Sequence, residues 1–320
     1  MAVDELTRSA PASGALPIRR GLPEPLPRET YDGLVRDALR EDLADAARAS
    51  DETGDLTSDA VVPEDRRALG RLVARAPGRL AGLAVFARVF DHAGGGVAVR
   101  LLAADGDAVE TGAVVAELEG RARTLLVGER TALNFLQHLS GVATHTARFV
   151  ERAGGARILD TRKTTPGLRA LEKYAVRCGG GENHRVGLFD EVMIKDNHAD
   201  LAGEPLAALV ARARRRVGAG VRITAEARDA GEAVAAVEGG ADVVLLDNFT
   251  PGGLAELCPR LREVARASGR AVELEASGGI GLANVAAVAA SGVDRISVGE
   301  LTHSAPALDL SLELEPAPRG

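Results

Sequence analysis

The segment Arg157-Ile-Leu-Asp-Thr-Arg-Lys163 joins a short apolar run directly to polar and charged residues, and this order recurs along the second half of the chain. Six such runs are predicted strands: Arg157–Leu159, Val192–Ile194, Val221–Thr224, Val243–Leu246, Val272–Leu274 and Arg295–Val298. Stretches rich in Ala, Leu and Arg separate most of them, an alternation typical of a parallel sheet with crossover helices. Six or more parallel strands indicate a barrel rather than an open three-layer sheet.

Polar residues follow each of these predicted strands. They are Asp160-Thr161-Arg162-Lys163, Lys195-Asp196-Asn197-His198, Glu226, Asp247-Asn248, Glu275-Ala276-Ser277-Gly278-Gly279 and Gly299-Glu300. The carboxyl ends of all strands in a parallel barrel lie on one face, so we expect these residues to meet at a single mouth. One polar residue after one strand is an ordinary loop start, but six in succession favour a functional site.

The residues of this predicted mouth suit a strongly anionic ligand. The cations are Arg162, Lys163, Arg185 and Lys195, with His184 beside them. Forked guanidinium groups bind carboxylates, and the acids Glu226 and Asp247 suit a Mg²⁺ ion that carries polyphosphate. Late glycine-rich loops, here Ser277-Gly278-Gly279 and Val298-Gly299, are usual phosphate sites in barrels. Catalysis would then rest on positioning and charge stabilisation.

The composition indicates a soluble globular protein of about two domains. The chain has 320 residues, of which 46% are apolar and 27% charged, and its formal net charge is −7. This acidic balance argues against nucleic acid as a partner, and the longest weakly polar stretch, Gly279 to Val293, is too short to span a membrane. With two cysteines and no visible secretory signal, we expect a cytoplasmic location.

Lysine is rare in this chain. Of the 39 basic residues 36 are Arg, and the three lysines, Lys163, Lys173 and Lys195, fall within 33 residues of one another. A chain that otherwise uses Arg is expected to keep Lys where a compact ammonium group is needed. We interpret Lys173, which lies inside a predicted helix, as an ion-paired structural residue.

Four segments are predicted along the chain. They are a flexible Pro-rich tail (residues 1–26), an N-terminal α+β sandwich domain (27–127), an α/β barrel (128–304) and a C-terminal segment that returns to the sandwich domain (305–320). The sandwich domain is expected to contain an amphipathic helix at Tyr31–Arg48 and β-like runs at Arg71–Arg75, Val97–Leu102 and Ala113–Leu118. A long helix is expected to begin at Gly128 and to end at Gly154-Gly155.

Several long motifs make the chain similar to a known family. They are Gly128-Glu-Arg-Thr-Ala-Leu-Asn-Phe-Leu-Gln-His-Leu-Ser-Gly-Val-Ala-Thr144, Asp160-Thr-Arg-Lys-Thr-Thr-Pro-Gly-Leu-Arg169, Cys178-Gly-Gly-Gly-Glu-Asn-His-Arg185, Ile194-Lys-Asp-Asn-His198, Glu275-Ala-Ser-Gly-Gly-Ile280 and Val298-Gly-Glu-Leu-Thr-His-Ser304. Together they resemble the quinolinate phosphoribosyltransferases, also called carboxylating nicotinate-nucleotide pyrophosphorylases. The resemblance runs from about residue 30 to the C-terminus.

This resemblance implies a fold, a reaction and an assembly. The fold is an N-terminal sandwich domain followed by an open α/β barrel of the TIM-like kind. The reaction converts quinolinate and phosphoribosyl pyrophosphate to nicotinate mononucleotide, pyrophosphate and CO₂ with Mg²⁺. The assembly is a homodimer, or a higher oligomer built from it, in which the sandwich domain of one subunit completes the barrel mouth of the other. Arg130 would reach the site of the neighbouring subunit.

The motifs also imply roles for single residues. Thr161, Arg162, Lys163, His184, Arg185 and Lys195 would line the dicarboxylate and phosphate pockets, and Ser277, Gly278, Gly279, Val298 and Gly299 would contact phosphate. Glu226 and Asp247 would lie near the ribose and reach Mg²⁺ mainly through substrate and water. The candidate catalytic residues are Lys163, Lys195, Glu226 and Asp247.

One departure from the family pattern concerns a predicted strand. The family usually reads Val-Glu-Val-Glu-Val, whereas this chain reads Ile223-Thr-Ala-Glu-Ala227, so that Thr224 replaces the first Glu. Glu226 keeps its place, and we retain it as the functional acid.

Three alternative functions stand beside this interpretation. The turn at Asp105-Gly-Asp107 resembles the hairpin region of biotinyl and lipoyl carrier domains, but no acceptor lysine lies there. A Schiff-base lyase could use Lys163 or Lys195 as its amine, although the clustered arginines favour anion binding. The third is a paralogue with the same fold that acts on another acceptor base, such as the molybdenum-transport-associated relatives.

Overall fold

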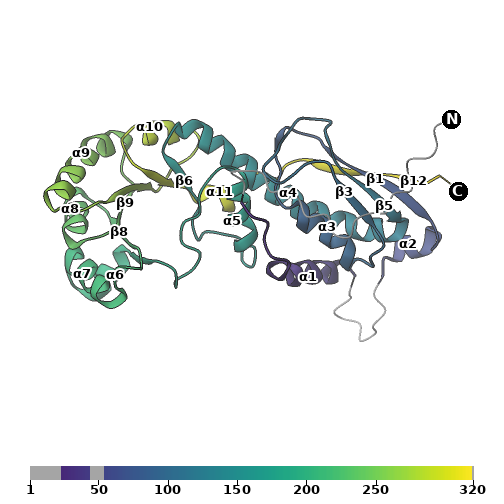
Figure 1. Cartoon of the computed structure of the whole chain (residues 1–320), viewed down its shortest axis with the longest axis horizontal. Helices are drawn as coiled ribbons and strands as arrows, with labels where there is room; N and C mark the ends of the chain where they lie inside the picture. The colour runs from purple at the N-terminus through teal and green to yellow at the C-terminus, as the bar shows by residue number, and fades with distance from the viewer. Residues whose placement is uncertain (1–22, 44–53, 319–320) are drawn as a thin grey trace.

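The structure is a computed structural model that describes residues 23–43 and 54–318, and it has two parts joined by one long helix (Figure 1). The first part is an antiparallel sheet packed against helices, and the second is a parallel sheet with helices outside it. The expected combination of an N-terminal sheet domain and an α/β barrel is confirmed. Most of the predicted Pro-rich tail lies outside the described residues, as do residues 44–48 of the predicted amphipathic helix.

The N-terminal sheet contains strands from both ends of the chain. Its strands are β1 (Arg67–Ala74), β3 (Ala98–Leu101), β5 (Val114–Arg121) and β12 (Leu310–Pro316), in the order β12-β1-β5-β3. All neighbouring pairs are antiparallel, and Leu72 of β1 lies opposite Leu312 of β12. A separate pair joins β2 (Gly78–Arg79) to β4 (Ala108–Val109). The C-terminal segment therefore returns to this domain.

Short helices complete the N-terminal domain. They are the 3₁₀ turn η1 (Arg28–Thr30), α1 (Asp32–Leu43), α2 (Leu56–Val61) and α3 (Leu83–His92). Phe86 and Phe90 of α3 are buried and meet edge to face with ring centroids 5.4 Å apart. Asp32 at the start of α1 binds Arg88 of α3 through two hydrogen bonds of 2.8 and 3.0 Å, so a bidentate ion pair holds the two helices together.

The helix α4 (Ala122–Ala153) connects the two parts of the molecule (Figure 1). It begins six residues before the predicted start at Gly128, because β5 ends at Arg121 and runs into it without a loop. Leu125 in the first turns is fully buried, so this part of the helix already belongs to the core. The helix ends at Gly154, which adopts the left-handed conformation with φ 62° that glycine tolerates best.

Six parallel strands form the barrel sheet. They are β6 (Arg157–Leu159), β7 (Val192–Ile194), β8 (Ile223–Ala227), β9 (Val243–Asp247), β10 (Glu273–Ser277) and β11 (Arg295–Ser297), in the order β6-β11-β10-β9-β8-β7. All five pairs are parallel. The outer strands β6 and β7 do not pair with each other, so the barrel is open between them. A single bridge from Leu159 to Glu182 occupies the free edge of β6.

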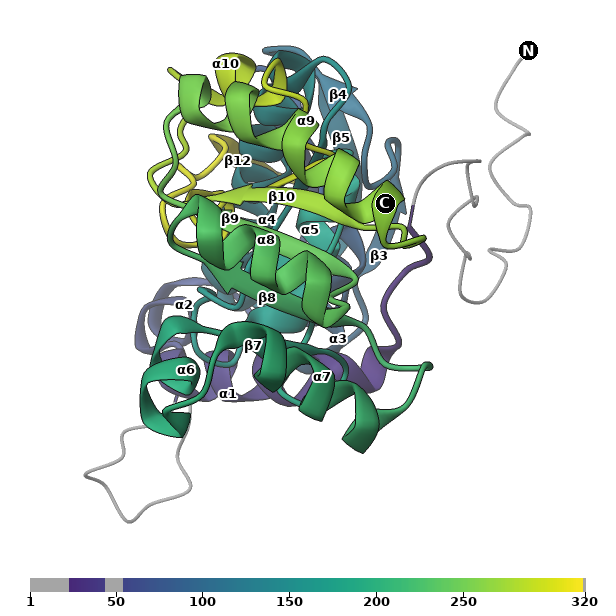
Figure 2. The same ribbon diagram turned by 90° about the vertical axis from the view of Figure 1, so that its left-hand side faces the viewer.

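Seven helices belong to the barrel part of the described chain. They are α5 (Arg169–Cys178), α6 (Asp196–Ala202), α7 (Leu206–Val217), α8 (Ala230–Gly239), α9 (Pro251–Ala267), α10 (Val285–Ala289) and α11 (Glu300–His303). Figure 2 shows α7, α8 and α9 lying side by side in front of the sheet, as crossover connections require. After α11 the chain passes α4 at Gly141, where an added Cβ would lie 2.3 Å from the carbonyl oxygen of Pro306.

Two strands lie later in the sequence than expected. The prediction of a strand at Val221–Thr224 is wrong in its bounds, since β8 spans Ile223–Ala227. Likewise, β10 spans Glu273–Ser277 rather than Val272–Leu274. Both strands continue through an acidic residue because their backbones pair with β9 as far as Ala227 and Ser277. Glu226 and Glu275 are therefore strand residues with largely buried side chains.

Two further observations bear on the expectations from composition. Cys178 and Cys258 are both free and buried. Among the described residues, no helix has the length and apolar character needed to cross a membrane. The cytoplasmic location stays a prediction.

Candidate active site

A cavity of about 530 Å³ opens at the carboxyl ends of the barrel strands. Eleven of the predicted site residues line it: Thr161, Arg162, Lys163, His184, Arg185, Lys195, Glu226, Asp247, Ser277, Gly278 and Gly279. They come from the ends of β6, β7, β8, β9 and β10 and from the segment before β7. The convergence expected for a parallel barrel is therefore present at one mouth.

Two arginines give this cavity its anion-binding character. The pKa of the Arg185 guanidinium is lowered mainly by burial and secondly by the positive charge of Arg162. Arg162 Nε is buried and has no hydrogen-bond partner among the described residues. Buried polar groups are almost always paired, so an unpaired N–H beside a second guanidinium indicates a site that is completed by an anionic ligand.

A buried ion pair supports the segment that carries His184 and Arg185. Lys173 of α5 pairs with Asp160, which follows β6, and neither side chain is more than 3% exposed. Burial raises the pKa of Asp160 to about 6 and lowers the pKa of Lys173, although the two charges oppose these shifts. This agrees with the interpretation of Lys173 as an ion-paired structural residue.

His184 forms part of the cavity wall. Its Nδ1 accepts a hydrogen bond of 2.7 Å from the backbone N–H of Arg185, so the ring proton resides on Nε2. That nitrogen faces Glu275 Oε1 at 3.3 Å, and the other carboxylate oxygen of Glu275 lies 2.7 Å from Arg295 Nε. Burial alone would raise the pKa of Glu275, but His184 and Arg295 hold it below its usual value. Both ring nitrogens of His184 thus face protein atoms.

The acids lie on the other side of the cavity. Glu226 on β8 forms an ion pair with Lys195, which follows β7. Asp247, at the end of β9, accepts a hydrogen bond of 2.6 Å from the Asn248 side chain. The pKa of Asp247 is raised, mainly by burial and secondly by the negative charge of Glu226. The positive charges of Lys195 and Lys163 oppose this shift. Two adjacent carboxylates with an unfavourable mutual charge make a place where a cation would be stabilised.

Glycines allow the backbone to approach this mouth. Gly278 has φ +87°, and a Cβ there would collide with the Asn248 side chain, 2.3 Å away. A Cβ on Gly299 would lie 3.0 Å from His303 and 3.1 Å from Lys163. Val298 and Gly299 do not line the cavity, and the Val298 N–H already donates to the Leu159 carbonyl oxygen. The expected phosphate contact from Val298 therefore has no free N–H in this structure.

Arg130 lies away from the cavity of its own chain. It is exposed on α4, and it makes no hydrogen bond or ion pair with any other described residue. Arg130 therefore lies outside the cavity of its own chain, and its expected place in the site of a second subunit stays a prediction.

Seven further residues line the cavity: Met193, Asp196, Asn197, Leu245, Asn248, Glu275 and Ser297. Four of them were expected at the mouth without an assigned role, namely Asp196, Asn197, Asn248 and Glu275. The sequence did not predict Met193, Leu245 or Ser297 there. Met193 and Leu245 are strand residues whose apolar character gives no functional signal.

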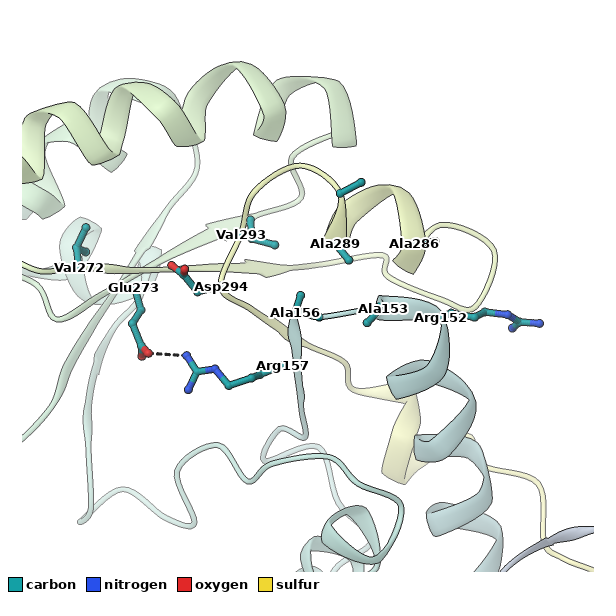
Figure 3. A pocket seen from close by; sticks show the side chains of 13 residues that line it. Arg152, Ala153, Ala156, Arg157, Val272, Glu273, Ala286, Ala289, Val293 and Asp294 are labelled. Atoms are coloured by element: carbon teal, nitrogen blue, oxygen red, sulfur yellow. Dashed lines mark hydrogen bonds and ion pairs between the residues drawn. The ribbon is translucent and has the colours of Figure 1, made fainter. Parts of the chain in front are cut away.

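A larger cavity, of about 780 Å³, lies at the opposite ends of β6, β10 and β11 (Figure 3). Its acids are already engaged, since Glu273 pairs with Arg157, and Asp294 pairs with Arg262 at 2.9 Å. Small side chains such as Ala286 and Ala289 line much of the remainder. The cavity at the carboxyl ends is therefore the candidate active site.

Comparison with known families agrees with this geometry over nearly the whole described chain. The family pattern described as "Quinolinate phosphoribosyl transferase, N-terminal domain" matches residues 55–140. The pattern described as "Quinolinate phosphoribosyl transferase, C-terminal domain" matches residues 142–313. The second match includes every residue that lines the cavity.

Individual relatives give the same result. The chain is 43% identical over 264 residues to a probable nicotinate-nucleotide pyrophosphorylase [carboxylating] of Bacillus subtilis, covering 82% of this chain and 88% of that protein. It is 40% identical to the corresponding protein of Mycobacterium leprae, covering 88% and 95%. Among solved structures, NadC from Streptococcus pyogenes superposes with a TM-score of 0.83 at 36% identity, covering 92% of this chain and 100% of that one.

Proposed function

This chain belongs to the quinolinate phosphoribosyltransferase family, and from that premise we propose how its cavity carries out the reaction. The enzyme transfers the phosphoribosyl group of phosphoribosyl pyrophosphate to quinolinate and releases CO₂, which gives nicotinate mononucleotide in NAD biosynthesis. The observation that carries the assignment of the site is the pair of guanidinium groups at Arg162 and Arg185, one with a buried unpaired N–H. A planar dicarboxylate is the ligand that such a pair fits.

The two substrates would occupy opposite sides of the cavity. The carboxylates of quinolinate face Arg162 and Arg185, at the ends of the Asp160–Lys163 and Glu182–Arg185 segments. Phosphoribosyl pyrophosphate lies toward the glycine-rich turn at Gly278, where the backbone can approach a phosphate group, and its pyrophosphate faces Lys163 and Lys195. Each charge-assisted hydrogen bond of this kind contributes roughly 1.5–3 kcal/mol.

The chemistry then needs charge stabilisation rather than a covalent enzyme intermediate. The ring nitrogen of quinolinate forms a bond to C1 of the ribose as the bond from C1 to the pyrophosphate oxygen breaks and the pyrophosphate leaves with the electron pair. Glu226 and Asp247 stabilise the positive charge that develops at C1. The first product is a pyridinium. When the bond from C2 to its carboxylate breaks, CO₂ departs, and the electron pair left at C2 is stabilised by the adjacent positively charged ring nitrogen. C2 then takes a proton from water, which gives nicotinate mononucleotide.

The acids fit a Mg²⁺ ion that travels with the pyrophosphate. The raised pKa of Asp247 beside Glu226 marks a place where added positive charge is favourable. Among the described residues, no group of three or more His, Cys, Asp or Glu side chains could hold a metal alone. Asp247, with Glu226 next to it, would therefore hold Mg²⁺ together with water and substrate oxygens, where the ion offsets pyrophosphate charge.

Arg130 supports a dimer with shared sites. Because Arg130 lies on α4 outside its own cavity, we propose that it completes the dicarboxylate site of a second subunit. Each dimer would then hold two composite sites, in keeping with the self-complementary contacts of a two-fold assembly.

The test is an acceptor comparison with purified protein. Quinolinate and nicotinate are each incubated with phosphoribosyl pyrophosphate and Mg²⁺, and products are identified by mass spectrometry. Nicotinate mononucleotide is expected from quinolinate at a kcat/KM at least ~100-fold above that for nicotinate, because nicotinate lacks one of the two carboxylates. Equal turnover of the two acids, or none of quinolinate, would contradict the proposal.

A further inference from the structure

A second polar layer lies in the barrel directly below the active-site residues. Met193 and Lys195 line the cavity, and side chains two residues apart along an extended strand share one face. Glu191, which immediately precedes β7, continues this row toward the barrel interior. On β8, Thr224 lies two residues before Glu226 and therefore shares its face of the sheet. Met193 of β7 lies opposite Thr224 in the strand pairing.

Glu191 and Thr224 contact each other in this layer. The Thr224 hydroxyl donates a hydrogen bond to Glu191 Oε1. Thr224 is fully buried, and Glu191 is only 9% exposed. A carboxylate removed from water is costly unless charges or donors surround it, so a neighbouring cation is expected to balance Glu191.

The nearby cation is Arg185, and its contact with Glu191 is through the main chain. Arg185 Nη1 approaches the Glu191 carbonyl oxygen at 3.5 Å, and the two side chains form no ion pair within 4 Å. At this short range the charge of the Glu191 carboxylate favours the protonated guanidinium, against burial and the repulsion from Arg162, which together lower the pKa of Arg185. The loop between the two residues is held by Asp190, which accepts the N–H groups of Val186 and Gly187 at 2.7 and 2.9 Å. Glu191 therefore has a fixed place beside Arg185.

We infer that Glu191 is a positioning residue which holds the Arg185 guanidinium for the substrate dicarboxylate, with Thr224 orienting its carboxylate. Glu191 does not line the cavity, so it acts through Arg185 and not on substrate. This inference rests on the proposed function, because it assigns Arg185 to quinolinate binding.

The same arrangement gives a physical reason for Thr224. A Glu at position 224, as in the resembling family pattern, would place a second buried carboxylate against Glu191. In this chain the carboxylate of that layer comes from Glu191, just before the start of the neighbouring strand β7, and Thr224 supplies the hydrogen-bond donor instead. The two positions are thus expected to depend on each other.

The first experiment compares E191Q and T224V with the wild type. E191Q removes the charge and keeps the size, whereas T224V removes the hydroxyl. We expect E191Q to raise the KM for quinolinate by about tenfold and T224V by about threefold, with the KM for phosphoribosyl pyrophosphate unchanged. E256Q, on the exposed face of α9, is the matched control. Calorimetric titration of quinolinate gives the same comparison without turnover.

The second experiment exchanges the carboxylate between the strands. E191A is expected to lose quinolinate affinity, T224E to lose both affinity and thermal stability, and the double variant E191A/T224E to recover affinity to within about threefold of wild type. An unchanged quinolinate KM in E191Q would overturn the inference, and so would a double variant no better than E191A. Failure of the wild type to use quinolinate would instead overturn the proposed function.

Discussion

Lys173 and Asp160 form a buried ion pair that binds both backbone polar groups of His184. Lys173 Nζ donates to the His184 carbonyl oxygen at 3.0 Å, and the His184 N–H donates to Asp160 Oδ1 at 2.9 Å. The backbone of His184 is thus fixed from two sides, by Lys173 of α5 and by Asp160, the residue after β6. Arg185 follows directly, so the ion pair also sets the place of its guanidinium.

Removing one member of this pair is expected to destabilise the protein strongly. K173M leaves the Asp160 carboxylate buried without its cation, and the free energy of unfolding should fall by about 3–5 kcal/mol. The double variant K173M/D160N should lose less than K173M alone. Urea denaturation measures both, with R216M on the exposed face of α7 as the control. A loss below about 1 kcal/mol in K173M would contradict the role given to the pair.

Replacing Arg185 by lysine is expected to weaken quinolinate binding while charge is kept. Lysine lacks the planar fork that engages a carboxylate through two parallel hydrogen bonds, so the KM for quinolinate should rise ~10- to 100-fold. The KM for phosphoribosyl pyrophosphate should change little. R216K serves as the matched control for an exposed arginine. An equal rise of both KM values would show that Arg185 does not act selectively on the dicarboxylate.

Shared sites predict complementation between two inactive variants. R130A should be inactive although its own barrel is intact, and D247N should be inactive although its Arg130 is intact. In a mixed dimer one site combines the intact barrel with the intact Arg130, so subunit exchange should restore about a quarter of wild-type activity. Activity measured after mixing and refolding tests this. No recovery in dimers shown by mass spectrometry to be mixed would exclude a shared site.

The link between α1 and α3 predicts a pH dependence of stability. The hydrogen bonds from Arg88 are the largest cause that lowers the pKa of Asp32. Burial raises this pKa in part, and the contact with His92 lowers it further, so that it falls from 3.8 to about 2. The unfolded chain therefore binds a proton first as the pH falls. The stabilisation is complete above pH 3.8 and is lost between about pH 4 and pH 2, by about 1 kcal/mol after allowance for partial solvent exposure.

This pH dependence is measured by comparing wild type with D32N. The difference in their free energies of unfolding should be constant from pH 7 to pH 5 and should shrink as the pH falls from 4 to 2. A difference that stays constant down to pH 2 would mean that Asp32 titrates normally in the folded protein.

The strand-end residues could be predicted because they obey a local rule. A short apolar run that passes into Arg162 and Lys163, or into Lys195, identifies both the parallel sheet and the face on which its chemistry lies. Gly278 and Gly279 could be predicted at the mouth for the same reason, and both line the cavity, whereas Gly299, predicted in the same way, does not line it. These signals are confined to a few neighbouring residues of the chain.

Features that depend on distant partners could not be predicted in the same way. Glu275 is buried in β10 because Arg295 pairs with its carboxylate and His184 Nε2 faces it, and neither residue is near it in sequence. The start of α4 at Ala122 has no capping residue or loop, because β5 runs directly into it. Hydrophobic periodicity and composition predict the secondary structure that a segment prefers. Whether a charged side chain is buried depends on tertiary contacts with residues distant in sequence.

The most direct test of the account measures CO₂ and pyrophosphate together. Quinolinate labelled with ¹³C in its C2 carboxylate is incubated with wild-type protein, phosphoribosyl pyrophosphate and Mg²⁺, with D247N as the inactive control. We expect one labelled CO₂ for each pyrophosphate released, and neither product when one substrate is left out. Pyrophosphate without labelled CO₂, or labelled CO₂ without phosphoribosyl pyrophosphate, would contradict it.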